Sequence, residues 1–342
     1  TLESITMTLD TRTASRKNLK QSFTSIRHHQ VTVLGSASDV GQTLCLLLRR
    51  QPNITKLIVH DSQAETPGVV QDLSHVPTNA AIKGFCGPEK MAQALQDSEI
   101  VIAAGGITHR PNSNNDTMWK TNTDFIKTFI STLSRLRPMP FVGIVTEPLN
   151  SIVPMAAEIM RNHGEYDPKK LFGITNIDVM RAQTIFAAQN NLDPLFISIP
   201  VIGGHSDQTI LPLLSQAKPT MKVTECITQD LTRKLRSADN EIIEAKKGFA
   251  PVLSIAYSAY LFTRSILEAL DGKPAMAHAL VDNNDFGTEY FSGIVTIDAN
   301  GVQEMKRYSN LSKYECHLLE SSIEHLRKDV LKGKKVLEYE TL

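Results

Sequence analysis

The sequence predicts an α/β fold: a doubly wound parallel sheet followed by a second, mixed α+β domain. From residue 31 onward, short β-branched runs alternate with longer amphipathic stretches, which is the pattern of repeated βαβ units. Beyond about residue 150 the pattern changes to long helices around a β-hairpin. A single hydrophobic core stops growing at about 250–300 residues, and this chain has 342 residues, so two domains are expected. We therefore expect a basic N-terminal extension over 1–30, a first domain over 31–150 and a second over 151–342.

Four apolar runs of strand length support the first domain. Each is followed by a loop and then a helical stretch, as parallel strands require, and they span residues 31–34, 57–60, 100–104 and 141–145. In the second domain, apolar residues at helical spacing predict helices over 224–247, 252–270 and 311–331. The hairpin has its first strand at 294–297, and Asn300-Gly301 supplies the positive φ of a tight turn.

Composition narrows the class of protein. With 41% hydrophobic and 21% charged residues, the chain has the make-up of a globular protein. Because 36 basic residues balance 36 acidic ones, the broad positive field of a non-specific nucleic-acid binder is missing. No apolar run approaches the ~18 residues of a membrane span. The four cysteines are too far apart for a metal motif and too few for a disulfide framework, so we expect free thiols and no metal site.

The first thirty residues differ from the rest of the chain. Ser and Thr are frequent there, the only acids are Glu3 and Asp10, and the basic residues include Arg12, Arg16, Lys17, Lys20 and Arg27. This composition is typical of a mitochondrial transit peptide and predicts the mitochondrial matrix. A solvated basic tail is the alternative.

A glycine turn after the first predicted strand indicates a dinucleotide site. Gly35 and Gly41 flank a turn that leads into a helix, whose N-terminal N–H groups would face a phosphate. Asp61 ends the next strand about twenty residues after Gly41, where an acid binds a ribose hydroxyl and favours NAD over NADP. Ser38 replaces a third glycine and Asp39 adds a carboxylate, and both are expected to weaken cofactor binding. A capped βα turn without a ligand is the alternative.

A second signal is a strand that runs into Gly-Gly and presents His205. Histidine is the side chain best suited to transfer a proton near neutral pH. Asp178 can orient its ring, and Arg181, three residues further along the same helix, can bind a carboxylate bidentately. Each feature also has an alternative interpretation without function. His205 alone could be an exposed histidine in a turn, and Asp178 with Arg181 could be a surface salt bridge.

Together these features resemble the malate and lactate dehydrogenase superfamily, most closely the mitochondrial type of malate dehydrogenase. Strings that carry the resemblance lie at 66–69, 72–77, 166–173, 199–206 and 209–216. The resemblance implies a Rossmann NAD-binding domain, a substrate domain and a homodimer. It also implies that His205 and Asp178 transfer the proton, that nicotinamide carries the hydride, that Arg181 binds a small 2-hydroxy or 2-oxo dicarboxylic acid, and that Asn122 contacts the cofactor.

The predicted substrate site departs from that family. The family has arginine where this chain has His109 and Asn115, and asparagine where it has Glu147. Over these three positions and Arg181, the side chains of the family carry a formal charge of +3. In this chain, Arg181 contributes +1 and Glu147 −1, so the formal charge is 0. A carboxylate ~5 Å from a substrate carboxylate costs roughly 3 kcal/mol at an effective dielectric of about 20. We expect one of two changes to reduce this repulsion: Glu147 takes up a proton, or it pairs with a protonated His109.

Three functions remain open from the sequence. The first is a malate dehydrogenase-family protein with lost or strongly reduced malate activity, retained as a dimeric structural or assembly component. The second is a working NAD-dependent malate dehydrogenase of reduced efficiency, of the tricarboxylic acid cycle type. The third is an NAD-dependent 2-hydroxy acid dehydrogenase of changed specificity. The apolar stretch 151–161 fits a dimer interface or, alternatively, a core helix.

Overall fold

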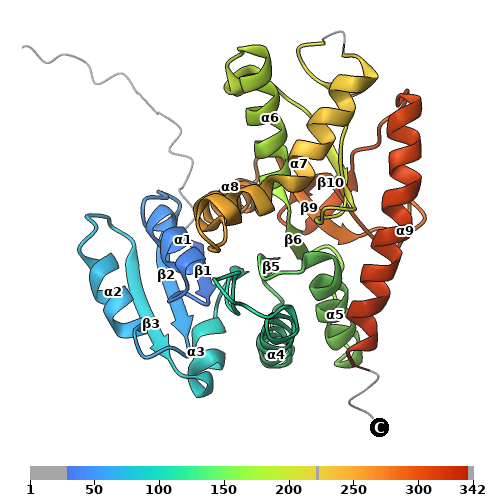
Figure 1. The fold of residues 1–342 in the computed structure, drawn as a ribbon. Helices are drawn as coiled ribbons and strands as arrows, with labels where there is room; N and C mark the ends of the chain where they lie inside the picture. The colour runs from blue at the N-terminus through green and yellow to red at the C-terminus, as the bar shows by residue number, and fades with distance from the viewer. Residues whose placement is uncertain (1–28, 221–222, 338–342) are drawn as a thin grey trace, which may run out of the picture.

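The computed structural model describes residues 29–220 and 223–337 (Figure 1). The predicted basic extension, except its last two residues, therefore lies outside the described residues. Those two residues belong to the first strand, since β1 begins at His29.

The first half of the chain forms a parallel sheet, as predicted. Its strands run in the order β3-β2-β1-β4-β5-β6, and their bounds are β1 His29–Leu34, β2 Ile54–Asp61, β3 Ala81–Cys86, β4 Ile100–Ala103, β5 Phe141–Ile144 and β6 Leu171–Ile174. All residues of β1, β4, β5 and β6 are buried, because helices cover both faces of the sheet. These helices are α1 Asp39–Arg49, α2 Thr66–Ser74, α3 Met91–Leu95, α4 Asn115–Leu133 and α5 Leu149–Asn162, with a 3₁₀ turn at Pro88–Lys90.

The second half continues the same sheet with antiparallel strands. β9 (Ala275–Asp282) pairs antiparallel with β6, and β10 (Tyr290–Asp298) then pairs with β9, β7 and β11. The remaining elements are β7 Val201–Gly203, β8 Ile210–Pro212, β11 Gly301–Met305, α6 Asn176–Asn190, α7 Glu225–Ala245, α8 Val252–Leu270, α9 Lys313–Lys335 and 3₁₀ turns at Pro194–Phe196 and Leu214–Gln216. The mixed α/β second domain is thereby confirmed.

Several predicted elements match these bounds closely. α8 begins and ends where the helical pattern predicts, and the predicted hairpin turns between Asp298 and Gly301, where Gly301 has φ +113°. The helix predicted after the glycine turn starts at Asp39, before Gly41, because the Ser38 hydroxyl accepts a hydrogen bond from Gly41 N and so caps the helix.

The apolar stretch 151–161 lies inside the chain. Its residues form α5, whose apolar side chains are buried, and α5 packs against α9, α4 and β6. Burial within one chain accounts for this composition, so α5 gives no support to a dimer interface.

One edge of the parallel sheet positions the site. The carboxyl ends of β1, β2, β4 and β5 meet there, and each carries a predicted site residue, which is Asp61 at the end of β2 and Gly35, His109 and Glu147 in the loops after β1, β4 and β5. Ligands of doubly wound sheets bind at this edge, where the strand order reverses between β1 and β4.

Candidate active site

The glycine turn is closely packed against the neighbouring loop. Gly35 has φ +79°, and a Cβ there would lie 2.1 Å from the Cα of Gly105. A Cβ on Gly41 would lie 2.1 Å from the carbonyl oxygen of Gly35. Ser38 folds into the turn, where its hydroxyl donates to Gly35 O at 2.8 Å and accepts from Gly41 N at 3.0 Å. Internal packing therefore requires glycine at both positions, and Ser38 occupies one N–H donor in the first turn of α1.

Asp61 links the end of β2 to the glycine turn. Its carboxylate accepts hydrogen bonds from Ala37 N at 2.9 Å and Gln63 N at 3.2 Å, and the residue is 8% exposed. A carboxylate has about four acceptor sites, so lone pairs remain for a ribose hydroxyl. Together with the N-terminal donors of α1, this geometry fits NAD.

Asp39 and Arg110 form an exposed ion pair beside this turn. The Arg110 guanidinium lies 3.3 Å from the Asp39 carboxylate, and their side chains are 61% and 52% exposed. Arg110 is therefore directed to the start of α1 and not to the position of the missing arginine at His109. An anion at the helix N-terminus would meet both charges.

The Asn122 side chain links the loop after β4 to the turn after β5. Its side-chain oxygen accepts from Ile107 N at 2.7 Å, and its amide nitrogen donates to Ile107 O at 3.1 Å and Glu147 O at 2.8 Å. The residue is 1% exposed. These bonds hold the loop after β4 and the turn after β5 at fixed positions. A direct contact between Asn122 and the cofactor stays a prediction.

The loop between β7 and β8 holds His205 rigidly. The Asn150 side-chain oxygen accepts from His205 N at 2.8 Å, and its amide nitrogen donates to Thr209 Oγ1 at 3.1 Å and Asp329 Oδ2 at 2.9 Å. A Cβ at Gly204 would lie 2.7 Å from this Asn150 oxygen, so glycine is required there. Asn150 is a positioning residue that the sequence analysis did not identify.

The His205 ring lies between two carboxylates. Its Nδ1 is 2.7 Å from Asp178 Oδ2, and its Nε2 is 3.1 Å from Glu147 Oε1. Asp178 is fully buried, whereas the Glu147 side chain is 42% exposed. Burial alone would lower the pKa of His205, but the charges of Asp178 and then Glu147 outweigh burial and raise this pKa well above its usual range. The two carboxylates therefore favour the imidazolium form of His205.

Glu147 thus pairs with His205 and not with His109, which corrects the second of the two alternatives expected from the sequence. The Glu147 Oε2 atom also accepts from Leu149 N at 2.9 Å, which fixes the carboxylate at the start of α5. His109 makes different contacts, because its Nδ1 lies 3.1 Å from Gly248 O and its carbonyl accepts from Ala250 N at 3.0 Å.

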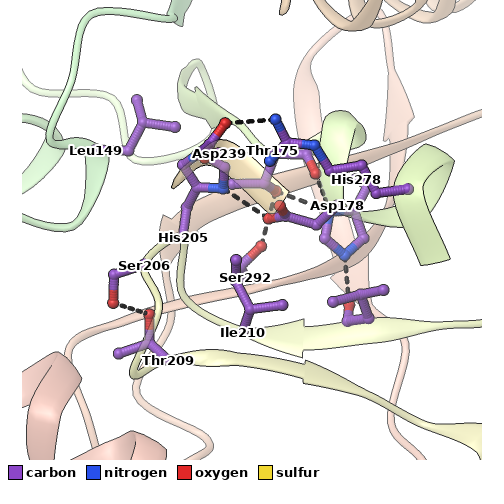
Figure 2. A network of polar contacts seen from close by, with 12 residues as sticks. Leu149, Thr175, Asp178, His205, Ser206, Thr209, Ile210, Asp239, His278 and Ser292 are labelled. Atoms are coloured by element: carbon purple, nitrogen blue, oxygen red, sulfur yellow. Dashed lines mark hydrogen bonds and ion pairs between the residues drawn. The ribbon is translucent and has the colours of Figure 1, made fainter. Parts of the chain in front are cut away.

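Arg181 also has an internal carboxylate partner. Its Nη2 lies 2.5 Å from Asp239 Oδ1, and the two side chains are 9% and 44% exposed. Arg181 Nε is buried and has no hydrogen-bond partner among the described residues. Burial would raise the pKa of Asp239, but the hydrogen bond and charge of Arg181 lower it. Figure 2 shows Asp178 and Asp239 near His205, so this ion pair belongs to the same site.

A cavity of about 310 Å³ is lined by His205, Glu147 and Asp239 and reaches Val40 beside the glycine turn, whereas Arg181 and Asp178 do not line it. It extends from Val40 of α1 past the ends of β4 and β5 to His205, and much of its wall is apolar. The charged residues that line it are Glu147, Asp207, Asp239, His205 and Arg236, together with the titratable His109. Arg236 is already bound to Ile210 O at 2.8 Å and Gln208 O at 3.0 Å. Asn115 does not line this cavity but is exposed at the start of α4.

Comparison with known families accounts for both halves of the chain. Residues 29–173 match the NAD binding domain of lactate/malate dehydrogenases, and residues 175–337 match the α/β C-terminal domain of the same family. The chain belongs to the lactate/malate dehydrogenase family. It is thus an NAD-linked 2-hydroxy acid dehydrogenase scaffold, and the resemblance stated from its sequence is confirmed.

Curated relatives of this dehydrogenase-family chain include mitochondrial malate dehydrogenases. The Homo sapiens protein is 33% identical over 320 residues, which cover 92% of this chain and 94% of the relative. The Felis catus protein is 32% identical over 324 residues, which cover 94% and 96%.

Solved structures share the fold. The malate dehydrogenase of Cryptosporidium parvum has a TM-score of 0.78 at 22% identity, over 90% of this chain and 99% of that one. The lactate dehydrogenase of Eimeria maxima with NADH and oxamate has a TM-score of 0.78 at 19% identity, over 92% and 97%. In the described part of the chain, no helix is long and apolar enough to cross a membrane.

Proposed function

We propose that this family member retains an NAD-binding scaffold, has lost or strongly reduced malate and oxaloacetate turnover, and serves as a dimeric structural or assembly component. The observation that carries the proposal is the contact of 3.1 Å between Glu147 Oε1 and His205 Nε2. Asp178 occupies Nδ1, so Nε2 is the atom left to exchange a proton with a substrate hydroxyl. An internal carboxylate fills that position.

The two carboxylates also oppose proton release. A histidine that accepts a proton from a hydroxyl must first be neutral, and the two carboxylates, which raise the pKa of His205, disfavour the neutral ring. In the opposite direction, the imidazolium would have to exchange its hydrogen bond to Glu147 for one to a substrate carbonyl. Both directions of the reaction are therefore slowed at the same atom.

Binding of the substrate carboxylate is opposed in the same way. Arg181 is nearly buried, and Asp239 already occupies its guanidinium at 2.5 Å. An incoming carboxylate must displace Asp239 or approach it, and two carboxylates at close range repel each other. His109 and Asn115 supply no guanidinium in compensation. Internal acids thus satisfy both polar contacts that a 2-hydroxy acid would make with Arg181 and His205.

The cofactor half of the site supports NAD. When bound, NAD would supply the hydride acceptor, and Gly35, Gly41, Asp61 and the α1 N-terminus are the residues that would hold it. Asp39 places a carboxylate at the start of that helix, and the exposed Arg110 offsets only part of its charge. We therefore expect NAD to bind more weakly than it would without Asp39.

A homodimer and mitochondrial matrix location complete the proposal. Exposed apolar side chains lie on α1 and α8, which pack against each other: Leu46 is 49%, Leu253 68% and Tyr257 44% exposed. A second copy covering this surface would bury them. The basic composition of residues 1–30 and the mitochondrial relatives support the location.

One observation favours a second candidate, a malate dehydrogenase of reduced efficiency. The His205–Asp178 pair is intact at 2.7 Å, which is the geometry that a proton relay needs. Changed specificity toward a neutral 2-oxo acid is the third candidate, because the cavity wall is largely apolar.

The test is an NADH-linked oxaloacetate assay on the purified full chain, run beside a titration with NAD. Saturable NAD binding with no oxaloacetate reduction supports the proposal. Reduction at the rate of a mitochondrial malate dehydrogenase measured in parallel contradicts it. A panel of neutral and charged 2-oxo acids tests the third candidate, and sedimentation velocity tests the dimer.

A further inference from the structure

A groove between α4 and α9, lined by other residues than the cavity at His205, carries a concentration of lysines. We define it as the lysine groove, a hollow of about 630 Å³ with Lys120, Lys127, Lys328, Lys332 and Lys335 in its wall and Trp119 beside them. Lys332 Nζ lies 4.3 Å from the centre of the Trp119 ring. Among the described residues that line the groove, the one acid is Asp124.

The lysines come from one face of each helix. Positions 120 and 127 are two turns apart on α4, and 328, 332 and 335 follow helical spacing on α9. Lys334, on another face of α9, pairs with Glu158 and Glu289. The dipole of α9 favours basic residues in its last turn, but it accounts neither for Lys328, further from the end, nor for the lysines of α4.

Like charges so close together repel, and this repulsion is relieved when an anion binds between them. The groove also has an apolar component, because Leu331 in its wall is 51% exposed and the Trp119 ring is partly exposed. Acidic side chains would meet the lysines, while an apolar side chain would meet Leu331 and Trp119. Apolar and charged side chains on one surface are a combination that protein interfaces use.

We propose that the lysine groove binds an acidic segment of a partner protein that also carries apolar side chains. Protein is favoured over nucleic acid because the cations are lysines without arginine, whose fork matches phosphate. The zero formal net charge of the chain also provides no long-range attraction for a polyanion. The proposal does not depend on catalytic activity, and it specifies the chemistry of an assembly partner.

Trp119 is the single tryptophan of the chain, so its fluorescence reports on this groove. We would titrate the full chain, without cofactor, with a short glutamate–leucine peptide and follow Trp119 emission and calorimetric heat. A lysine–leucine peptide of equal length is the charge control. We expect saturable binding of the acidic peptide, weakened by added salt, and none of the basic one.

The decisive variant is the triple substitution Lys120→Glu, Lys328→Glu and Lys335→Glu, which leaves the Lys332–Trp119 contact in place. Its matched control is Lys218→Glu, Lys306→Glu and Lys313→Glu, which makes the same charge change at other exposed positions. We expect the first to weaken binding at least tenfold and the second less than twofold. Circular dichroism of both variants verifies the fold.

Four results would overturn the proposal. The first is the absence of any emission change and heat with the acidic peptide, and the second is equal weakening by both triple variants. The third is tighter binding of an oligothymidylate or of phosphatidylserine vesicles than of the peptide. The fourth is binding seen only after truncation at Leu337, because the acidic residues Glu338 and Glu340 of the same chain would then be the natural ligand.

Discussion

Replacing Glu147 with glutamine removes the charge beside His205 Nε2 and keeps the size of the side chain. A substrate carboxylate bound at this site would lie about 5 Å from the Glu147 carboxylate. Because Glu147 is 42% exposed, we take an effective dielectric of about 40, between the protein surface and water. The repulsion is then about 1.7 kcal/mol, or roughly twentyfold in Kd. We expect Glu147→Gln to tighten oxamate binding to the NADH-loaded protein by that factor.

The same substitution changes the titration of His205. Without Glu147 the pKa of His205 falls, because one of the two charges that raise it is gone. Neutral histidine then becomes available at lower pH, so any malate oxidation should begin at lower pH in the variant than in the natural chain. NMR titration of the His205 ring measures the pKa, and stopped-flow or calorimetric titration measures oxamate affinity.

The sign of the stability effect follows from linkage. The pKa of His205 is raised in the folded chain, so protonated His205 stabilises the fold. This stabilisation is fully present below the pKa of histidine in the unfolded chain, near 6.5, and is lost as pH rises through the pKa of His205 in the folded chain. The natural chain should therefore exceed Glu147→Gln in stability near pH 6, and the difference should shrink at alkaline pH. Glu304→Gln, at an exposed position, is the control. An unchanged His205 titration together with unchanged oxamate affinity would refute this reasoning.

Three further substitutions test the other parts of the site. Asp239→Asn should lower the free energy of unfolding by about 1–3 kcal/mol and let oxamate raise the melting temperature, because it leaves the buried Arg181 without its partner. Asp230→Asn, on the same helix, is the control and should have neither effect. Gly35→Ala should lower the free energy of unfolding in urea by at least ~2 kcal/mol. The loss should exceed that of Gly164→Ala, where φ is also positive but no atom lies near an added Cβ, and equal losses would contradict the packing argument. Asp61→Ala should weaken NAD binding about tenfold and NADP binding less, as followed by NADH and NADPH fluorescence; an equal loss for both would refute the ribose contact.

The sequence reveals the parallel sheet because its central strands are continuous apolar runs. β1, β4 and β5 are wholly buried, and burial on both faces produces that pattern. β3 was not predicted because it is an edge strand in which half-buried and exposed residues mix with Gly84. β6 (Leu171–Ile174) was not predicted either, although it is as long and as buried as β4 and β5.

The sequence also predicts that His205, Asp178 and Arg181 meet, because two local motifs and the family resemblance place them. It does not predict Asp239, since the pair with Arg181 joins residues that lie 58 positions apart on different helices. No local spacing marks an acid in a long helix as an active-site group. Glu147 was recognised as a substitution, but its contact with Nε2 depends on the turn after β5, which only the folded chain shows.

The two internal ion pairs explain why residues of a proton relay persist in a site that we propose to be inactive. A guanidinium buried like that of Arg181 is costly without an anion, and two neighbouring acids favour the charged form of His205. In a family member that binds substrate through such an arginine, the anion comes and goes with the ligand. Here Asp239 and Glu147 supply it permanently. Under the proposed loss of turnover, Arg181 and His205 remain as the counter-ions of these acids, because removing either one would leave its carboxylate without that partner.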